Sequence, residues 1–197
     1  MEQTNEGIQN ISHKITTDKV LFFDMDGTLI DTDLANLLSY TKAIKSVTKS
    51  NYNLIYDTDK RFNRNNLKDS IPNLKETEYE KIIQEKENYY SEFLPQTKLI
   101  TTTTDILLKY SKTNKTVLVT NCREDRVLMT LNYHELIGTF SNIFYRQNTD
   151  KNRINKYMNA ITSLNISAKS VIVFENEQIE ITDALIAGIN KLNIIKI

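Results

Sequence analysis

The feature that most constrains the fold of this chain is the apolar run Val20–Phe23, which leads directly into the segment 24–29, DMDGTL. A continuous apolar run of this length is typical of a strand buried on both faces of a parallel sheet. A glycine and a threonine then turn the chain, so Asp24 and Asp26 are expected at the carboxyl end of the strand, where catalytic groups collect in such sheets. Two carboxylates this close repel each other, which indicates a hard divalent cation with oxygen ligands, Mg²⁺.

The second half of the chain alternates short apolar strands with segments of helical period. The predicted strands cover 116–119, 142–145, 171–174 and 192–195. This alternation predicts an α/β fold with a doubly wound, Rossmann-like parallel sheet. Residues 34–94 keep a helical pattern without strand-like alternation, which predicts an inserted all-α cap. We therefore expect a polar N-terminal lead-in over 1–18, an α/β core over 19–33 and 95–197, and a helical cap over 34–94.

The composition excludes several classes of function. The 197 residues include 25 basic and 25 acidic side chains, so a formal net charge of zero gives no global bias toward nucleic acid. No stretch approaches the ~20 apolar residues of a membrane span, and the first residues lack the apolar centre of a signal peptide. The single cysteine, Cys122, excludes an internal disulfide. We expect a compact cytoplasmic protein, a monomer or homodimer, whose partner is a small molecule and neither nucleic acid nor a membrane.

The segment DMDGTL resembles the first motif of the haloacid dehalogenase superfamily of aspartyl-phosphate-forming hydrolases. Later positions are similar to the other three motifs of that family, in the same order along the chain. These positions are Thr120 with Asn121, Lys151, and Glu175 with Asn176. The resemblance covers nearly the whole chain and points to the phosphatase type with a small helical cap, similar to β-phosphoglucomutase and phosphoglycolate phosphatase.

The resemblance implies a Mg²⁺-dependent phosphatase that hydrolyses a small phosphorylated metabolite, with Asp24 as nucleophile and Asp26 as general acid and base. It further implies phosphate binding by Thr120, Asn121 and Lys151, and Mg²⁺ held by Asp24, Asp26, Glu175 and Asn176. Two alternatives stay open. A phosphomutase of the same superfamily would keep both aspartates, and a catalytically weakened relative would bind a phosphorylated ligand or a partner protein through its cap.

The fourth motif departs from the family pattern, because Asn176 stands where an acidic metal ligand is expected. An amide oxygen can bind Mg²⁺, but the loss of one anionic ligand predicts a lower metal affinity. Glu177, Glu180 or Asp183 could compensate, or these acids simply suit the first turns of a helix. Thr120 also has a second interpretation, since threonine is a favoured N-cap residue at the start of any helix.

The third motif departs as well, because the prolines that often follow its lysine are missing after Lys151. Lys151 does stand six residues ahead of the helical aromatic Tyr157, as the motif requires. Arg153 or Lys156 is the alternative, although the helical pattern places Lys156 on the solvent side. In the cap, Arg64 is either a substrate contact, since a guanidinium can bind an anion in bidentate fashion, or a solvated loop charge.

Overall fold

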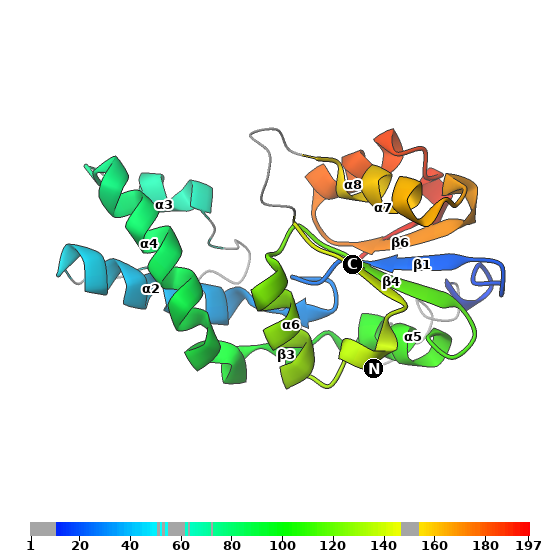
Figure 1. Ribbon diagram of the computed structural model, residues 1–197, viewed down its shortest axis with the longest axis horizontal. Helices are drawn as coiled ribbons and strands as arrows, with labels where there is room; N and C mark the ends of the chain where they lie inside the picture. The colour runs from blue at the N-terminus through cyan, green and yellow to red at the C-terminus, as the bar shows by residue number, and fades with distance from the viewer. Residues whose placement is uncertain are drawn as a thin grey trace. The chain divides into compact units, whose positions relative to one another are not determined.

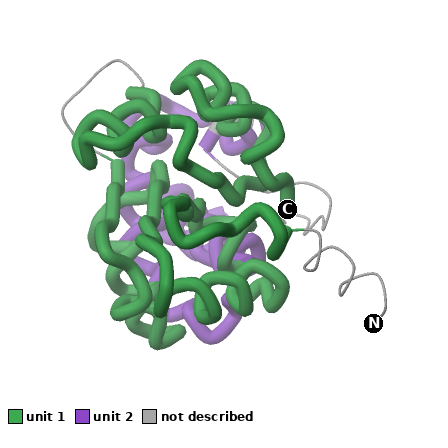
Figure 2. Tube along the Cα trace, turned by 90° about the vertical axis from the view of Figure 1, so that its right-hand side faces the viewer, with its two compact units in different colours: residues 1–30, 99–197 green, residues 31–98 purple. Residues whose placement is uncertain are grey.

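The computed structural model (Figure 1) describes residues 11–50, 52, 54, 62, 64–71, 73–146 and 154–197. The chain divides into two compact units, of which unit 1 comprises Met1–Ile30 and Leu99–Ile197 and unit 2 comprises Asp31–Lys98 (Figure 2). The chain passes between the units at two short strands, β2 (Ile30–Asp31) and β3 (Lys98–Leu99), which pair with each other. The described part of the chain contains no helix with the length and apolar character needed to cross a membrane.

Unit 1 is built on a five-stranded sheet in which all neighbouring strands are parallel. In spatial order the strands are β5 (Asn142–Phe144), β4 (Lys115–Val119), β1 (Val20–Phe23), β6 (Val171–Glu175) and β7 (Ile194–Lys196). The central strand β1 pairs in register with both neighbours, so that Phe23 lies between Leu118 and Phe174. The order in which the chain visits the strands reverses around β1, as in a doubly wound sheet.

Helices cover both faces of this sheet (Figure 1). Side chains of α5 (Thr101–Tyr110) and α6 (Glu124–Tyr133) pack on Leu21 and Phe23, whereas side chains of α7 (Lys156–Leu164) and α8 (Gln178–Ile186) pack with Val20 and Phe22. Alternate residues of β1 therefore enter opposite cores, which explains why the whole strand is apolar. The described part of unit 1 also includes the short 3₁₀ helices η2 (Ile137–Thr139), η3 (Ala168–Ser170) and η4 (Lys191–Asn193). The predicted α/β fold class is confirmed.

Because β4, β1 and β6 are parallel neighbours, their carboxyl ends meet at one edge of the sheet. Asp24 follows β1 directly, Thr120 follows β4, and Glu175 is the last residue of β6. The backbone N–H of Asp24 donates to the carbonyl of Phe174 at 3.1 Å and so continues the pairing one residue beyond the strand. The sheet itself thus gathers three of the predicted site positions.

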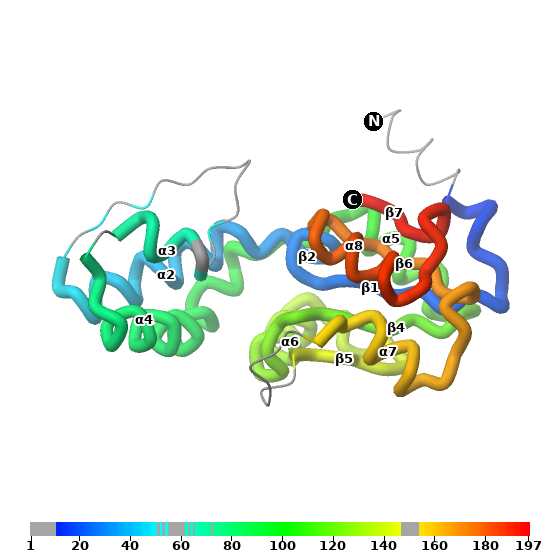
Figure 3. Tube along the Cα trace, turned by 90° about the horizontal axis from the view of Figure 1, so that it is seen from above, coloured from blue at the N-terminus to red at the C-terminus, as the bar shows by residue number. Residues whose placement is uncertain are grey.

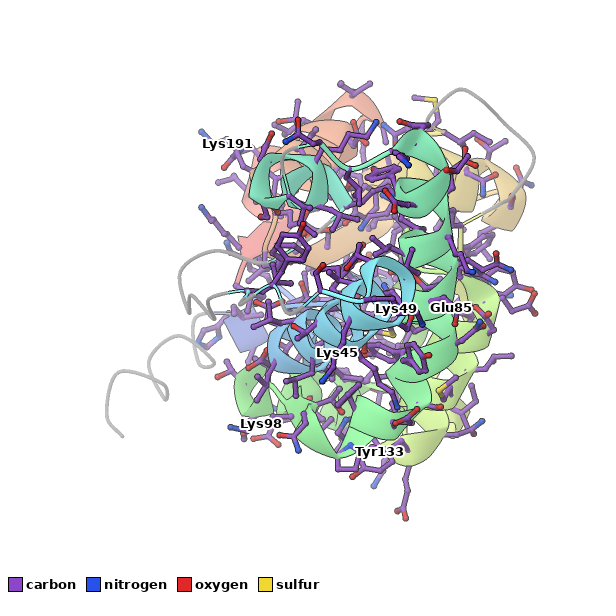
Figure 4. All side chains as sticks on the ribbon, turned by 90° about the vertical axis from the view of Figure 1, so that its left-hand side faces the viewer. Lys45, Lys49, Glu85, Lys98, Tyr133 and Lys191 are labelled. Carbon is purple, nitrogen blue, oxygen red and sulfur yellow. The ribbon has the colours of Figure 1, made fainter. Side chains whose placement is uncertain are left out.

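Unit 2 is helical, with α2 (Asp33–Thr48), α3 (Arg64–Ser70), α4 (Glu76–Tyr89) and the 3₁₀ helix η1 (Tyr90–Gln96) packed together (Figure 3). Its small core includes Tyr40, Ile44 and Ile82. Charged side chains stay exposed here, such as Lys45 on α2 and Lys49 at its C-cap (Figure 4). The helical insertion expected from the sequence is therefore present.

Candidate active site

A tight loop after β1 presents the two aspartates of the first motif. Gly27 has φ +82° and donates its N–H to the carbonyl of Ile30 at 2.7 Å, a conformation that side chains disfavour. The carbonyl of Met25 accepts hydrogen bonds from the three amides that follow Gly27. Asp24 and Asp26 are only 6% and 7% exposed, so both carboxylates need partners to offset the cost of burial.

Lys156 supplies the partner of Asp24. Its ammonium nitrogen lies 2.7 Å from Asp24 Oδ1, 2.9 Å from Glu175 Oε2 and 3.5 Å from Glu180 Oε2. Lys156 is the first residue of α7, and side chains of a helix tilt toward its N-terminus, so the ammonium reaches the edge of the sheet. The expectation that Lys156 faces solvent is therefore wrong. Lys151, the other candidate for this role, lies outside the described residues.

Glu175 is fully buried, and four donors converge on its carboxylate. Oε1 accepts from the backbone N–H groups of Asn176 and Glu177 at 2.9 and 3.0 Å. Oε2 accepts from Lys156 and from the Tyr157 hydroxyl at 2.5 Å. A carboxylate offers about four lone-pair positions, so these bonds account for all of them. Burial, followed by the charge of Glu175, raises the pKa of Tyr157 well above its ordinary value, which keeps the phenol as a donor.

The Lys156 ammonium and the Asp24 carboxyl each shift the pKa of the other. Burial raises the pKa of Asp24 to about 7, although the adjacent Lys156 ammonium acts in the opposite direction. Burial likewise opposes the charge of Lys156, but Asp24, Glu175 and Glu180 together raise its pKa above the ordinary value. Among the described residues, the Lys156 ammonium thus contacts three carboxylates, those of Asp24, Glu175 and Glu180.

Asn176 lies against the loop of the first motif. Its Oδ1 accepts a hydrogen bond from the Thr28 hydroxyl at 3.1 Å. A Cβ atom on Gly27 would lie 2.3 Å from Asn176 Nδ2, so the amide fills the space that the glycine leaves. The residue that replaces the expected acid is therefore close to the aspartate loop and has a defined packing role.

The residues fit a magnesium ion in chemical type. The Asp24 carboxylate, the Asn176 amide oxygen and the Asp26 backbone carbonyl belong to this edge of the sheet, and all are hard oxygen donors of the kind Mg²⁺ prefers. A divalent cation here would also be attracted by the carboxylates that Lys156 contacts. Among the described residues, however, no group of three or more His, Cys, Asp or Glu side chains is arranged to hold a metal. Because Asn176 is neutral, these ligands carry less negative charge than they would with an acid at position 176.

Thr120 and Asn121 lie at the same edge. Thr120 is 3% exposed and its hydroxyl accepts from the backbone N–H of Cys122 at 3.2 Å. Helix α6 begins at Glu124, and its N-cap is Arg123, so Thr120 does not cap that helix. The side-chain amide of Asn121 donates to Glu180 Oε1 at 3.0 Å, which ties the end of β4 to α8. Glu180 therefore joins the cluster through two contacts.

Arg126 is a site residue that the sequence reasoning missed. Its Nη2 donates to Asp26 Oδ2 at 2.9 Å, with both side chains largely buried. No sequence signal distinguishes this arginine from other charges on an amphipathic helix. The sequence did name Lys156 as an alternative to Lys151, but its helical pattern placed the side chain toward solvent, whereas the structure buries it. Arg64 belongs to unit 2, where it begins α3 and is exposed.

Comparison with known proteins identifies the family to which this chain belongs. A family model described as haloacid dehalogenase-like hydrolase matches residues 21–194. The chain belongs to this family. This confirms the recognition made from the DMDGTL segment and the later motifs, and it makes the protein a haloacid dehalogenase-like hydrolase. No match was found among curated proteins.

Several solved structures share the fold of this chain. A haloacid dehalogenase-like hydrolase from Streptococcus pneumoniae has a TM-score of 0.71 and 18% identity, covering 89% of this chain and 84% of that one. A predicted phosphoglycolate phosphatase from Haemophilus somnus has a TM-score of 0.71 and 20% identity, covering 92% and 86%. CbbY from Rhodobacter sphaeroides, determined in complex with phosphate, has a TM-score of 0.70 and 12% identity, covering 87% and 84%.

Proposed function

We propose that this haloacid dehalogenase-like hydrolase is a Mg²⁺-dependent phosphatase that hydrolyses a small-molecule phosphomonoester through an aspartyl phosphate on Asp24. The observation that carries the proposal is the setting of Asp24: a buried carboxylate at the end of the central strand, held by Lys156 at 2.7 Å, with Asp26 two residues away. A nucleophile oriented by a fixed cation beside a second carboxylate suits a two-step displacement at phosphorus.

In the first step an Asp24 oxygen attacks phosphorus, the bond from phosphorus to the ester oxygen breaks, and Asp26 gives its proton to the leaving oxygen. In the second step Asp26 takes a proton from water as that water attacks the phosphorus of the aspartyl phosphate, which frees Asp24 and phosphate. Mg²⁺ bound by Asp24, the Asp26 carbonyl and Asn176 would supply positive charge to the phosphoryl oxygens. Glu175, with its lone pairs engaged, holds Lys156 in place.

The phosphoryl oxygens would be bound by Thr120, Asn121 and a lysine. We assign the lysine role to Lys156, because its ammonium contacts the nucleophile, and Lys151 stays an alternative. Arg64 is proposed as a contact for the remainder of the substrate. The partner is accordingly a small phosphorylated metabolite, and the single reduced thiol of Cys122 suits a cytoplasmic location.

The test is hydrolysis of 4-nitrophenyl phosphate by wild type, Asp24→Asn and Asn176→Asp, each with Mg²⁺ and with EDTA. The matched control is Asp105→Asn, an exposed aspartate on α5. Metal-dependent turnover in wild type and Asp105→Asn that Asp24→Asn abolishes supports the proposal.

The Thr28 to Asn176 hydrogen bond favours a second candidate, a metal-impaired relative that binds a phosphorylated ligand without turnover. That candidate predicts no turnover by wild type across phosphate esters, but turnover by Asn176→Asp. Turnover by Asp24→Asn would contradict both candidate functions.

A further inference from the structure

An arginine of helix α6 holds the second aspartate of the loop after β1. Arg126 Nη2 donates to Asp26 Oδ2 at 2.9 Å, and the two side chains are 14% and 9% exposed. Most ion pairs of helix surfaces are solvated and weakly oriented, whereas this one is largely shielded from water. The contact joins residues 100 positions apart, so it links α6 to the loop after β1.

The guanidinium is itself held from a second side. Its Nε donates to Cys122 Sγ, one turn earlier on the same segment, and Cys122 is 3% exposed in the core beneath the sheet. The neighbouring Val127 is fully buried and anchors that turn of α6. Because the guanidinium is planar and rigid, contacts at Nε and Nη2 together fix its orientation. A lysine ammonium could reach Asp26 but could not make both contacts.

We propose that Arg126 is a positioning residue that sets the direction of the Asp26 carboxylate for proton transfer. The proposal rests on the proposed function, in which Asp26 protonates the leaving oxygen and later deprotonates water. A catalytic carboxylate must be held within roughly 0.5 Å and 10–20° of its productive geometry by groups that are themselves fixed. Arg126 meets this requirement, since it contacts Asp26 and is anchored by Cys122. It touches no reacting atom in this scheme and acts only through Asp26.

The measurement compares kcat and KM for 4-nitrophenyl phosphate and phenyl phosphate in wild type, Arg126→Met and Arg126→Lys. The phenolate leaving group of phenyl phosphate is more basic and depends more on a well-placed acid. We expect Arg126→Met to lower kcat for phenyl phosphate by about 10- to 100-fold, which is part of the full effect of a general acid. The kcat for 4-nitrophenyl phosphate should fall much less. KM should change little for either ester. Arg126→Lys keeps the charge and the fold, and should show the same leaving-group dependence in weaker form.

Two controls separate positioning from simple structural support. Arg123→Met removes an arginine from the same segment that pairs only with the exposed Asp125 among its described contacts. It should leave kcat and KM unchanged for both esters. In an Asp26→Asn background, Arg126→Met should have almost no further effect on the leaving-group dependence, because the group that it positions is gone.

Equal losses for both esters, or losses confined to KM, would overturn the positioning role while leaving the phosphatase proposal intact. If Arg126→Met does not fold, the Arg126→Lys comparison decides by the same criterion. A wild type that hydrolyses neither ester with Mg²⁺ would refute the phosphatase proposal, and the positioning role would fall with it.

Discussion

At the scale of single residues, Gly27 and Asn176 depend on each other. Gly27 has φ +82°, and a Cβ at this position would meet Asn176 Nδ2 at 2.3 Å. We expect Gly27→Ala to lower the free energy of unfolding by about 2 kcal/mol or more, from backbone strain together with displacement of the amide. Gly138→Ala is the matched control, since a Cβ there meets nothing within 4 Å. Urea unfolding measures both, and equal effects of the two substitutions would contradict this account.

The same pair gives a prediction for the metal. Asn176→Asp places a negative charge against the loop of the first motif and keeps an oxygen that can accept from Thr28. We expect the affinity for Mg²⁺ to rise by roughly tenfold or more, in line with the effect of single ligand changes at metal sites. Isothermal titration calorimetry measures this without any substrate. Asn132→Asp, an exposed change on α6, should leave the affinity unchanged; a similar rise there would show that only net charge matters.

At the scale of elements, the first turn of α7 determines where Lys156 lies. Asn155 caps this helix, because its Oδ1 accepts from the backbone N–H groups of Tyr157 and Met158, and its amide donates to the carbonyl of Asp183 on α8. We expect Asn155→Ala to cost about 1 kcal/mol of stability and also to lower kcat, since the ammonium loses its fixed support. Asn155→Asp keeps the cap acceptor and should cost much less. Equal costs for both variants would assign the effect to the Asp183 bond instead.

The elements also show what the sequence could and could not predict. Apolar runs identify strands, and their parallel order follows from the alternation with helices, so the meeting of Asp24, Thr120 and Glu175 at one edge was predictable. The same reasoning placed Lys156 wrongly, because helical period reports the direction of the Cα–Cβ bond. A long side chain in a first turn can reach beyond that face to the strand ends.

Arg126 shows a second limit of prediction from the sequence. It lies beside the buried stripe of α6, next to Val127, and its partner Asp26 is on a distant loop. Nothing local in the sequence specifies such a pair, since it depends on how β4 and α6 pack against the loop after β1. Thr120 differs again: its residue type suited a helix cap, but α6 begins three residues later than that interpretation requires, and Arg123 takes the N-cap position.

At the scale of the whole molecule, the raised pKa of Asp24 makes global stability depend on pH. Burial raises the pKa of Asp24 from 3.8 to about 7, so the folded state binds one more proton than the unfolded state between these values. The resulting stabilisation is fully present below pH ~4 and is lost as the pH rises through about 7. The difference between these two pKa values sets an upper bound of about 4 kcal/mol on this contribution.

Urea unfolding in EDTA across pH 5 to 8 tests this linkage. Asp24→Asn carries no proton that titrates at this position, so its free energy of unfolding should fall less than that of wild type as the pH rises, whereas Asp105→Asn should follow wild type. Saturating Mg²⁺ should flatten the wild-type profile, because a cation bound at Asp24 replaces the proton and stabilises the folded state above neutral pH. Parallel profiles for wild type and Asp24→Asn would show that Asp24 is not the group behind the pH dependence and would contradict this account.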